Sequence, residues 1–263
     1  MAEYDVVVLG SGPGGYVAAI RAGQLGLKTA VVERAELGGV CLNWGCIPSK
    51  ALLRNAEVLS LIQNADAFGV TVENLRYDFG VAVDRSRKVV RRLTSGVGSL
   101  LKKNRVEHVE GTGALRDRNT VDVGDGSRVL NADNVIVATG ARFRGIPTAP
   151  ADGQVVITSR EALELREVPG RTVIVGGGAT GVEFAYLFSV YGSQVTIVEL
   201  LPRLVPTEDE EVSRLLERSF ARRGIRSMTG SSIESVEIRA DSALVTATSG
   251  DGNVEIECDK VLV

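Results

Sequence analysis

The sequence predicts an α/β protein in which a β-α-β unit occurs twice. Two apolar runs, 5–10 and 171–176, have the composition of buried parallel strands. Each run leads into a glycine-rich turn, which is followed by apolar residues at helical spacing and then by a second apolar run. The composition agrees, because 44% of the residues are hydrophobic, 24% are charged and 30 of the 263 are glycine. A chain of this length has room for one large domain or two ordinary ones.

The first unit is expected to start with the strand at 5–10 and the turn at 11–15. A helix should follow over 16–25 and end at Gly26, and the run 28–33 should form the next strand. The elements expected after it are helices over 49–65 and 78–104, a β-meander over 106–129 and a buried strand over 134–140. Gly96 and Gly98 predict a kink in the longer helix.

The second unit follows an irregular segment, 141–150, which contains Pro147 and Pro150 and is typical of a crossing between domains. We therefore divide the chain into domains at 1–146 and 147–263. The elements expected in the second domain are a strand over 171–176, a turn over 176–181, a helix over 182–191 and a strand over 194–199. The run 259–263 resembles the start of another buried strand. We therefore expect a fragment of a longer protein, truncated within its second domain.

Each glycine-rich turn has the spacing G-x-G-x-x-G between a strand and a helix. The first contains Gly10, Gly12 and Gly15, with Glu33 at the end of the next strand. In this pattern the first glycine permits a tight turn, the second lets a pyrophosphate approach the backbone, and the third lets the helix pack on the strand. The helix N-terminus attracts the phosphates, and the acid accepts bonds from ribose hydroxyls. We interpret the unit as Rossmann-like and dinucleotide-binding, in preference to a glycine-rich turn without a ligand.

The second turn meets the same criteria with Gly176, Gly178 and Gly181. The acid Glu199 follows the first of these glycines by 23 residues, the same distance as in the first copy. An acid at this position repels a 2′-phosphate and favours NAD over NADP. Arg203 argues for NADP, but three residues separate it from the acid, which therefore carries more weight. Two such sites on one chain indicate electron transfer between two dinucleotides, for which FAD and NAD are the natural pair.

Cys41 and Cys46 follow the first unit closely. Four residues separate them, so their sulfurs can close a small disulfide ring if the backbone between them curls. Beside a redox cofactor, such a ring would relay two electrons. A metal site is the alternative, but zinc requires four ligands, and the other candidates, Cys258 and His108, lack ligand spacing. We expect no metal, a packed Cys258 and a non-catalytic His108.

Charge and cysteine usage argue against several classes of protein. The net charge of −3 gives no reason to expect nucleic acid or an anionic membrane as partner. No apolar run approaches the roughly 20 residues needed to span a bilayer, and early charged residues argue against a signal peptide. Three cysteines do not make a secreted disulfide framework, so we expect a cytoplasmic protein. The basic run 85–92 is expected to lie on a solvated helix face.

The segment 38–53, Gly-Gly-Val-Cys-Leu-Asn-Trp-Gly-Cys-Ile-Pro-Ser-Lys-Ala-Leu-Leu, resembles the redox-active segment of the flavin-dependent pyridine nucleotide-disulfide oxidoreductases. Its ending, together with the run Gly-Gly-Gly-Ala-Thr-Gly-Val-Glu-Phe-Ala at 176–185, is most similar to the branch that oxidises dihydrolipoamide. The resemblance covers all 263 residues in order. It implies two Rossmann-like domains with central parallel sheets and β-meanders, one for FAD and one for NAD, and a missing C-terminal dimerisation domain.

The resemblance also implies roles for the residues that match. Cys46 would be the thiolate nearest the flavin, and Cys41 the outer thiol that exchanges with substrate. Lys50 would lie near flavin N5, paired with Glu183. The residues implied to contact FAD are Gly10, Gly12, Pro13, Gly14, Gly15, Glu33, Arg34, Gly39, Val40, Cys41, Lys50, Gly113, Ala138, Thr139 and Gly140. The residues implied to bind NAD are Gly176, Gly178, Gly181, Glu183, Glu199 and Ile233.

The implied reaction is the oxidation of dihydrolipoamide on a lipoyl-bearing carrier protein of a 2-oxo acid dehydrogenase or glycine cleavage complex, by a homodimer. The chain departs from the family pattern at Val40, Trp44 and Thr180, which alter packing but remove no reacting atom. The missing domain would supply a His–Glu pair to the partner subunit's active site. We therefore expect this chain to be inactive alone.

Two alternatives stay open. The first is an NADPH-dependent enzyme similar to the glutathione and mercuric reductases, which share the cysteine frame; Glu199 argues against it. The second is a fragment that binds dinucleotides and turns nothing over.

Overall fold

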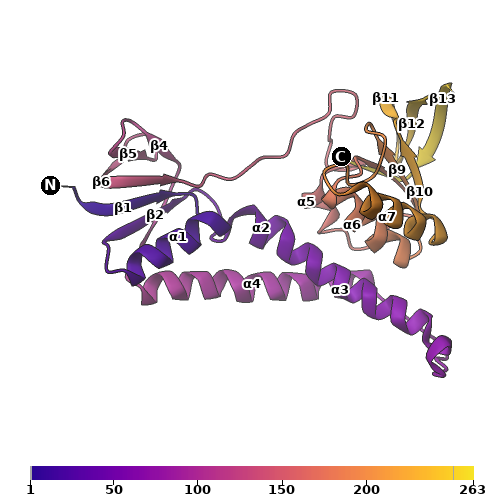
Figure 1. The fold of residues 1–263 in the computed structure, drawn as a ribbon, viewed down its shortest axis with the longest axis horizontal. Coiled ribbons are helices and arrows are strands. Elements are labelled where there is room, and N and C mark those ends of the chain that lie inside the picture. The colour runs from indigo at the N-terminus through magenta and orange to yellow at the C-terminus, as the bar shows by residue number, and fades with distance from the viewer. Residues whose placement is uncertain (1, 251) are drawn as a thin grey trace. The chain divides into compact units, whose positions relative to one another are not determined.

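The structure is a computed structural model, in which residues 2–250 and 252–263 are described (Figure 1). It contains two compact units. One consists of the chain up to Pro48 together with Ser86–Arg142, and the other of Ser49–Arg85 together with Phe143–Val263. Each unit contains one of the two predicted β-α-β motifs.

Residues Ser49–Arg85 group with the second unit because of their apolar side chains. Leu52 and Phe79 are buried in the same core cluster as Phe188. The sequence had placed this segment in the first domain, since it is contiguous with the first β-α-β motif. The division of the domains between residues 146 and 147 stays a prediction.

A six-stranded sheet with the order β3-β2-β1-β6-β5-β4 forms the first unit. Its strands are β1 (Tyr4–Leu9), β2 (Thr29–Glu33), β3 (Glu107–Glu110), β4 (Gly113–Leu115), β5 (Thr120–Val123) and β6 (Arg128–Val137). The first four in this spatial order pair in parallel, whereas β4, β5 and the start of β6 pair antiparallel. The meander expected over 106–129 is therefore wrong at its start. β3 instead extends the parallel sheet beside β2, and its Val109 is buried there.

The helices of the chain's first half are α1 (Pro13–Gln24), α2 (Gly39–Trp44), α3 (Cys46–Gln63), the 3-10 helix η1 (Ala65–Phe68) and α4 (Phe79–Lys103). α1 lies along β1 and β2 (Figure 1). It begins earlier than predicted, because proline at the first helical position loses no hydrogen bond. α4 runs as one helix through Gly96 and Gly98, so the expected kink does not interrupt it.

A five-stranded parallel sheet with the order β10-β9-β8-β14-β7 forms the second unit. Its strands are β7 (Val156–Ile157), β8 (Arg171–Val175), β9 (Gln194–Glu199), β10 (Arg226–Thr229) and β14 (Lys260–Leu262). An antiparallel meander follows β10, with β11 (Ser232–Arg239), β12 (Ser242–Ser249) and β13 (Gly252–Cys258). The helices are α5 (Ser159–Ala162), α6 (Ala179–Val190) and α7 (Glu210–Arg222). The strand expected at 259–263 is confirmed as β14, beside β8.

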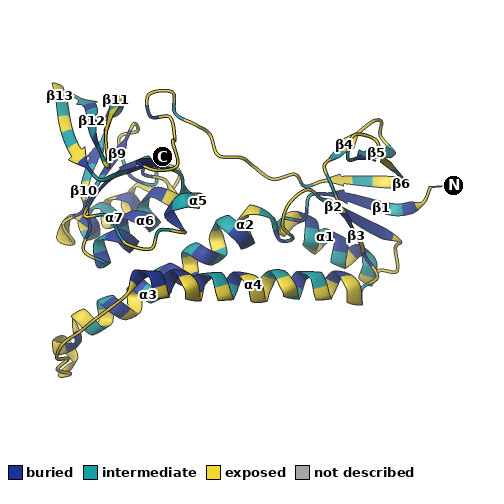
Figure 2. Ribbon diagram, turned by 180° about the vertical axis from the view of Figure 1, so that it is seen from behind, coloured by how far each residue is buried: buried dark blue, intermediate teal, exposed yellow. Residues whose placement is uncertain are grey.

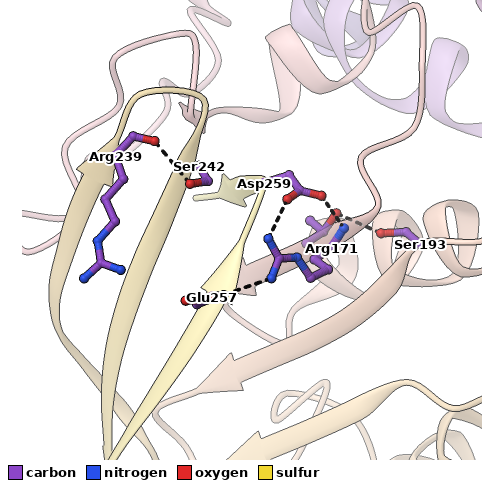
Figure 3. Close-up of polar contacts among 7 residues, drawn as sticks. Arg171, Ser193, Arg239, Ser242, Glu257 and Asp259 are labelled. Carbon is purple, nitrogen blue, oxygen red and sulfur yellow. Dashed lines mark hydrogen bonds and ion pairs between the residues drawn. The ribbon is translucent and has the colours of Figure 1, made fainter.

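Arg171 ties the start of β8 to the end of the meander (Figure 3). Its backbone N–H donates to Asp259 Oδ2 at 2.8 Å, and its guanidinium donates to Asp259 Oδ1 at 3.0 Å and to Glu257 Oε2 at 3.2 Å. The neighbouring hydroxyls of Thr172 and Ser193 lie 3.0 Å apart. The bonds of Arg171 to Asp259 and Glu257 set the position at which the chain enters β14 beside β8.

In both units the core lies on the two faces of the parallel sheet (Figure 2). Successive side chains of a strand point to opposite faces. In β1, Val6 and Val8 therefore pack in the cluster that contains α1, whereas Val7 packs with the meander strands. In β8, Ile174 packs with α6 and Val173 with the second meander. The near-continuous apolar runs that predicted these strands follow from this burial on both sides.

Within the described residues, no helix has both the length and the apolar character that crossing a membrane requires.

Candidate active site and nucleotide turns

The first glycine-rich turn joins β1 to α1 and is shaped by two of its glycines. Gly10 has a φ of 92°, in the left-handed region that favours glycine. A Cβ atom at Gly15 would overlap the carbonyl oxygen of Gly10, so α1 can approach β1 this closely only with glycine at this position. This is the helix–strand packing that the pattern predicts for its third glycine.

The middle of the same turn is open to a ligand. A Cβ at Gly12 would meet nothing within 4 Å, and one at Gly14 would meet only Ala138 Cβ, at 4.0 Å. Gly12 is also the N-cap of α1 and brings no side chain to the first helical N–H groups, whereas Thr158 and Asp209 cap α5 and α7 with their side chains. The start of α1 therefore leaves room and N–H donors for an anion, and it fits a dinucleotide pyrophosphate.

Glu33 braces this turn from the end of β2. Its Oε2 accepts hydrogen bonds from the backbone N–H of Ser11 at 2.9 Å and from the Ser11 hydroxyl at 2.8 Å, and its Oε1 accepts from the N–H of Ala35 at 3.0 Å. Burial opposes ionisation of the carboxyl, but these bonds outweigh it and hold the pKa of Glu33 below its ordinary value. The acid predicted to reach a ribose thus also fixes the turn, through a serine that the sequence analysis did not single out.

Cys41 and Cys46 form a disulfide, with their Cα atoms 4.7 Å apart. α2 carries the first cysteine and ends at Trp44, Gly45 is its C-cap, and α3 starts at the second cysteine, so the backbone between the sulfurs curls as a small ring requires. Cys41 is half-buried and Cys46 is exposed. Because Cys46 is the first residue of an 18-residue helix, the positive end of the helix dipole favours its thiolate once the bond is reduced.

The cysteine segment is joined to the first glycine-rich turn. Gly38 has a φ of 92°, and its N–H donates to the carbonyl oxygen of Ser11 at 3.1 Å. A Cβ at Gly39 would lie 2.7 Å from Gly12 Cα, so only glycine lets α2 start this close to the turn. We call α2, which carries Cys41, the disulfide helix. Within the first unit its start is therefore a neighbour of the turn that fits a pyrophosphate.

Residues of α4 also hold the cysteine segment. Arg87 donates from Nη1 to the carbonyl oxygen of Asn43 at 2.9 Å, and its guanidinium carbon lies 5.0 Å from the centre of the Trp44 ring. Asn43 Nδ2 donates to the carbonyl oxygens of Leu37 at 3.0 Å and Gly39 at 2.9 Å. The contact with Arg87 explains how the segment accommodates a tryptophan, through a cation–π interaction. No local pattern marks this arginine, because the contact joins distant parts of the chain.

Lys50 and Glu183 lie together in the second unit. Lys50 Nζ is 2.5 Å from Glu183 Oε1, and the two side chains are 60% and 26% exposed. Lys50 comes one turn after Cys46 on α3, and Glu183 lies on the first turns of α6. An ion pair this exposed adds little to stability. Its sequence-predicted role beside the flavin stays a prediction.

The second glycine-rich turn repeats the geometry of the first. Gly176 has a φ of 103°, and a Cβ at Gly181 would overlap its carbonyl oxygen. A Cβ at Gly178 would meet nothing within 4 Å, and this glycine is the N-cap of α6. The start of α6 therefore fits a second dinucleotide for the same reasons as the start of α1.

Glu199 is 7% exposed and braces the second turn. Its Oε2 accepts from the N–H of Gly177 at 2.5 Å, and its Oε1 accepts from the N–H of Leu201 at 2.7 Å. Arg203, the residue that argued for NADP, donates from Nη2 to the carbonyl oxygen of Pro206 at 3.1 Å. This arginine is therefore bound to its own loop, which leaves the acid as the charged group at the end of β9.

The remaining residues predicted to contact cofactors fall into two groups. Six of them, at the starts of α1 and α2 or just after β2 and β6, are half-buried or exposed: Pro13, Arg34, Val40, Ala138, Thr139 and Gly140. Two others have packing roles. A Cβ at Gly113 would lie 2.7 Å from Leu9 Cδ2, and Ile233 is buried in the core beside the second meander. Their contacts with FAD and NAD stay predictions.

The two residues considered as extra metal ligands are distant from the disulfide in the sequence. Cys258 is buried at the end of β13, and burial raises the pKa of its thiol to about 11. His108 is half-buried on the edge strand β3. Within residues 2–250 and 252–263, no group of three or more His, Cys, Asp or Glu side chains could hold a metal ion.

Known proteins resemble the whole chain. The model of the family described as pyridine nucleotide-disulphide oxidoreductase matches residues 4–263. The chain is 50% identical over 268 residues to a dihydrolipoyl dehydrogenase of Chlorobaculum tepidum and 47% identical over 266 residues to one of Mycobacterium tuberculosis. Each alignment covers 100% of this chain and 57% of the relative. The chain therefore spans little more than half the length of the curated relatives it matches.

Solved structures show the same fold. The HOCl-induced flavoprotein disulfide reductase RclA from Escherichia coli is 26% identical and superposes with a TM-score of 0.81, over 98% of this chain and 55% of that one. A Cu(II) complex of the same reductase also has 26% identity and a TM-score of 0.81, over 100% of this chain and 56% of that one. The α/β fold with two Rossmann-like parallel sheets is thereby confirmed.

Proposed function

Because the chain belongs to the pyridine nucleotide-disulphide oxidoreductase family, we propose that it is the dinucleotide-binding part of a dihydrolipoyl dehydrogenase. In this proposal the electrons of dihydrolipoamide pass through the Cys41–Cys46 disulfide to FAD and then to NAD. The family and its dihydrolipoyl dehydrogenases use FAD and NAD. The chain covers 57% of such relatives, so turnover would be a property of the longer protein.

The observation that carries the proposal is the junction between the disulfide helix and the first glycine-rich turn. Gly38 donates to Ser11, and Gly39 lies against Gly12, so α2 starts on the turn itself. A dinucleotide whose pyrophosphate lies on the start of α1 would thus have the disulfide segment as a neighbour. A structural disulfide has no reason to be placed there.

The residues that would hold FAD are those of the first turn and the acid beyond it. Gly12 and Gly14 give the pyrophosphate room, the first N–H groups of α1 donate to it, and Glu33 accepts from the adenosine ribose. When bound, FAD supplies a two-electron acceptor for the reduced cysteines and a hydride donor for NAD. Gly178, the start of α6 and Glu199 would hold the second dinucleotide in the same way.

The first chemical step is thiol–disulfide exchange. A thiolate of the substrate attacks Sγ of Cys41, the Cys41–Cys46 bond breaks, and Cys46 leaves as a thiolate. The second substrate thiol, once deprotonated, attacks the substrate sulfur of the mixed disulfide and releases Cys41 as a thiolate. The substrate is oxidised to a cyclic disulfide, the cysteines gain two electrons, and two protons are given up. The order of attack, with Cys41 outer and Cys46 inner, is part of the proposal.

Two features of the chain favour Cys46 as the leaving thiolate. It is the first residue of α3, where the helix dipole is positive, and Lys50 adds a cation one turn later. A lower thiol pKa makes a better leaving group. Glu183 holds Lys50 through the ion pair and would restrict the lysine side chain to one orientation.

The partners follow from the same proposal. The substrate would be a lipoyl group on a carrier protein of a 2-oxo acid dehydrogenase or glycine cleavage complex. The longer protein would act as a homodimer, with the base that accepts the thiol protons coming from outside this chain. His108, the one histidine of the sequence, lies on edge strand β3, and nothing in its position suggests that role.

An NADPH-dependent disulfide reductase is the second candidate. Two observations oppose it: Glu199 stands where a 2′-phosphate would need a cation, and Arg203 donates to the carbonyl oxygen of Pro206. A non-catalytic dinucleotide-binding fragment is the third candidate. It is the behaviour that we expect of the 263-residue chain when it is assayed alone.

The test is steady-state oxidation of dihydrolipoamide by the FAD-loaded longer protein, with NAD and NADP as alternative acceptors. We expect turnover with NAD and a kcat/KM for NADP lower by about 10²-fold or more. Turnover with glutathione and NADPH, or a preference for NADP, would favour the second candidate. Absence of any dithiol oxidation by protein that contains FAD would refute the proposal.

A further inference from the structure

The loop that follows β9 is held against the second glycine-rich turn by a residue in an unusual conformation. Val205 has a φ of 42°, in the left-handed region. A β-branched residue there is a genuine outlier, and Pro206 restricts Val205 further. Backbone strain of this kind persists only where the surroundings impose it, and it concentrates at functional sites.

The surroundings that impose it begin with the turn itself. The N–H of Val205 donates to the carbonyl oxygen of Gly177 at 2.8 Å. Leu204 is fully buried, and a Cβ at Gly177 would lie 2.5 Å from its Cδ2. The loop therefore contacts Gly177, which lies between the first two glycines of the pattern, Gly176 and Gly178. Gly177 in turn donates its own N–H to Glu199.

The loop is also anchored on its far side. Leu204 donates its N–H to Glu217 Oε1 on α7 at 2.9 Å, and the Ser213 hydroxyl, on the same helix, donates to the carbonyl oxygen of Val205 at 3.4 Å. Arg203 donates to the carbonyl oxygen of Pro206. Residues 203–206 are thus a strap whose central residues, Leu204 and Val205, are held by the glycine-rich turn on one side and by α7 on the other.

The equivalent contact in the first unit needs no strain. There the carbonyl oxygen of Ser11, which follows Gly10 as Gly177 follows Gly176, accepts from the N–H of Gly38. Gly38 also has a positive φ, but glycine adopts it freely. The second unit keeps a valine at the equivalent point, so the bond to the turn, and not the side chain, explains the conformation.

We propose that the strap 203–206 positions the second glycine-rich turn, and that Val205 is a positioning residue for the NAD that binds there, acting through Gly177. The inference rests on the proposed function, since it concerns the same nucleotide. The strap holds the carbonyl of Gly177, which belongs to the peptide that joins it to Gly178, and Glu199 holds the N–H of Gly177, which belongs to the preceding peptide. Together the two bonds fix the peptide planes on both sides of Gly177. The N–H groups at the start of α6 then face the pyrophosphate before it arrives.

The test compares NAD affinity, measured by calorimetric titration of the FAD-saturated protein, among variants that keep or lose the Val205 N–H. Val205→Pro removes this donor and cannot adopt a positive φ, so we expect NAD to bind about 10-fold more weakly. Val205→Gly keeps the donor and accepts the φ without strain, so its affinity should stay within about 3-fold of wild type. FAD affinity should be unchanged in both, because FAD binds the other unit.

Ala240→Pro is the matched control. Ala240 also has a positive φ, 44°, and lies in the same unit, at the tip of the hairpin between Arg239 and Ser242 (Figure 3) and outside the turn at 176–181. It should leave NAD affinity within about 3-fold of wild type. An equal loss in Ala240→Pro and Val205→Pro would show general destabilisation and overturn the inference, as would unchanged binding in Val205→Pro or a Val205→Gly loss as large as that of proline.

Glu217→Ala decides the matter if Val205→Pro does not fold. It removes the anchor on α7 without touching the turn, and a loss of about 5-fold or more in NAD affinity, larger than the range allowed for the control, supports the strap. Unchanged affinity contradicts it. If wild-type protein binds FAD but no NAD, the proposed function fails together with this inference; if wild type binds NAD and these variants bind it equally well, the inference alone fails.

Discussion

The two glycine-rich turns have the same backbone framework but different neighbours. In each, an acid at the end of the next strand accepts the N–H of the residue after the first glycine, Ser11 in one unit and Gly177 in the other. In each, the carbonyl of that residue accepts an N–H from a residue with positive φ. In the first unit this donor is Gly38 and leads into the disulfide helix; in the second it is Val205 and leads towards α7.

The difference shows that the residues packed against each turn determine which side chain fits at a variable position of the G-x-G-x-x-G pattern. The position in question is the one after the first glycine. Ser11 is fully buried and uses its hydroxyl to reach Glu33. At Gly177 that space is taken by Leu204, so no side chain fits. One framework therefore supports a turn joined to a redox disulfide and a turn joined to a strap without redox groups.

The largest expected effect separates the units by chemistry. Cys41→Ser or Cys46→Ser should lower dihydrolipoamide oxidation by the FAD-loaded longer protein by about 10³-fold or more, because either change removes the disulfide that the substrate attacks. Oxidation of NADH by an artificial flavin oxidant should remain, since it needs only the two nucleotide turns. Parallel assays of both reactions check this, and substantial dithiol oxidation without the disulfide would contradict a redox role for the first unit.

The next effect separates the two kinds of glycine within one turn. Gly181→Ala places a methyl group against the carbonyl oxygen of Gly176 and should lower the free energy of unfolding by about 1–3 kcal/mol. Gly178→Ala meets nothing in the protein, so stability should change by less than about 0.5 kcal/mol. Its methyl group should nevertheless weaken NAD binding by about 10-fold or more, because it lies where the pyrophosphate approaches.

Urea unfolding and NAD titration of this pair check the distinction. Gly15→Ala and Gly12→Ala provide the same pair for FAD in the first unit, with the same expected split. Equal loss of stability in both members of a pair would show that the open side of the turn is needed for folding and not for a ligand.

Exchanging the residues that differ between the turns should give unequal results. Gly177→Ser forces Leu204 aside and should cost about 2–3 kcal/mol of unfolding free energy. Ser11→Gly loses one hydroxyl bond to Glu33 and should cost about 1 kcal/mol. Thermal unfolding of the two single variants measures the asymmetry, and a cost for Ser11→Gly as large as that for Gly177→Ser would refute the role given to Leu204.

The smallest effect concerns pH and the first turn alone. The pKa of Glu33 is lower in the folded protein than in the unfolded chain, because the bonds from Ser11 and Ala35 outweigh burial. The contribution of ionised Glu33 to the free energy of unfolding is therefore complete above the pKa of the unfolded chain, about 4.3. It is lost as pH falls through the lower pKa of the folded protein. Glu33→Gln should flatten the acid limb of a stability–pH curve. An unaltered limb in this variant would mean that other carboxyls cause the acid dependence.

Local patterns in the sequence predicted most of the framework. The two apolar runs, the glycine spacings and the acids fix each β-α-β unit, because these features act within about 25 residues of one another. The disulfide could also be predicted, because Cys41 and Cys46 lie within one short segment of the sequence. The parallel strands and the strand at β14 followed from apolar runs that are buried on two faces.

Contacts between distant parts of the chain could not be predicted from local sequence patterns. β3 joins β2 across more than 70 residues, and its four residues carry too little pattern to reveal a parallel partner. The contact of Arg87 with Trp44 and the bond from Val205 to Gly177 depend on where helices and loops return. No local signal marks a valine for a positive φ, and Gly38 could have been anticipated only because glycine is common at such points.

The most direct test of the account is the visible spectrum of the FAD-loaded protein before and after addition of two electrons. We expect a long-wavelength band from the Cys46 thiolate beside oxidised flavin. In wild type it should appear when two electrons reduce the disulfide. In Cys41→Ser, which has no disulfide to reduce, it should be present before reduction and be lost when the electrons reduce the flavin, and Cys46→Ser should show no such band. A band that persists in Cys46→Ser, or a wild-type protein that binds FAD and shows none, would contradict the claim that the disulfide helix lies against the flavin.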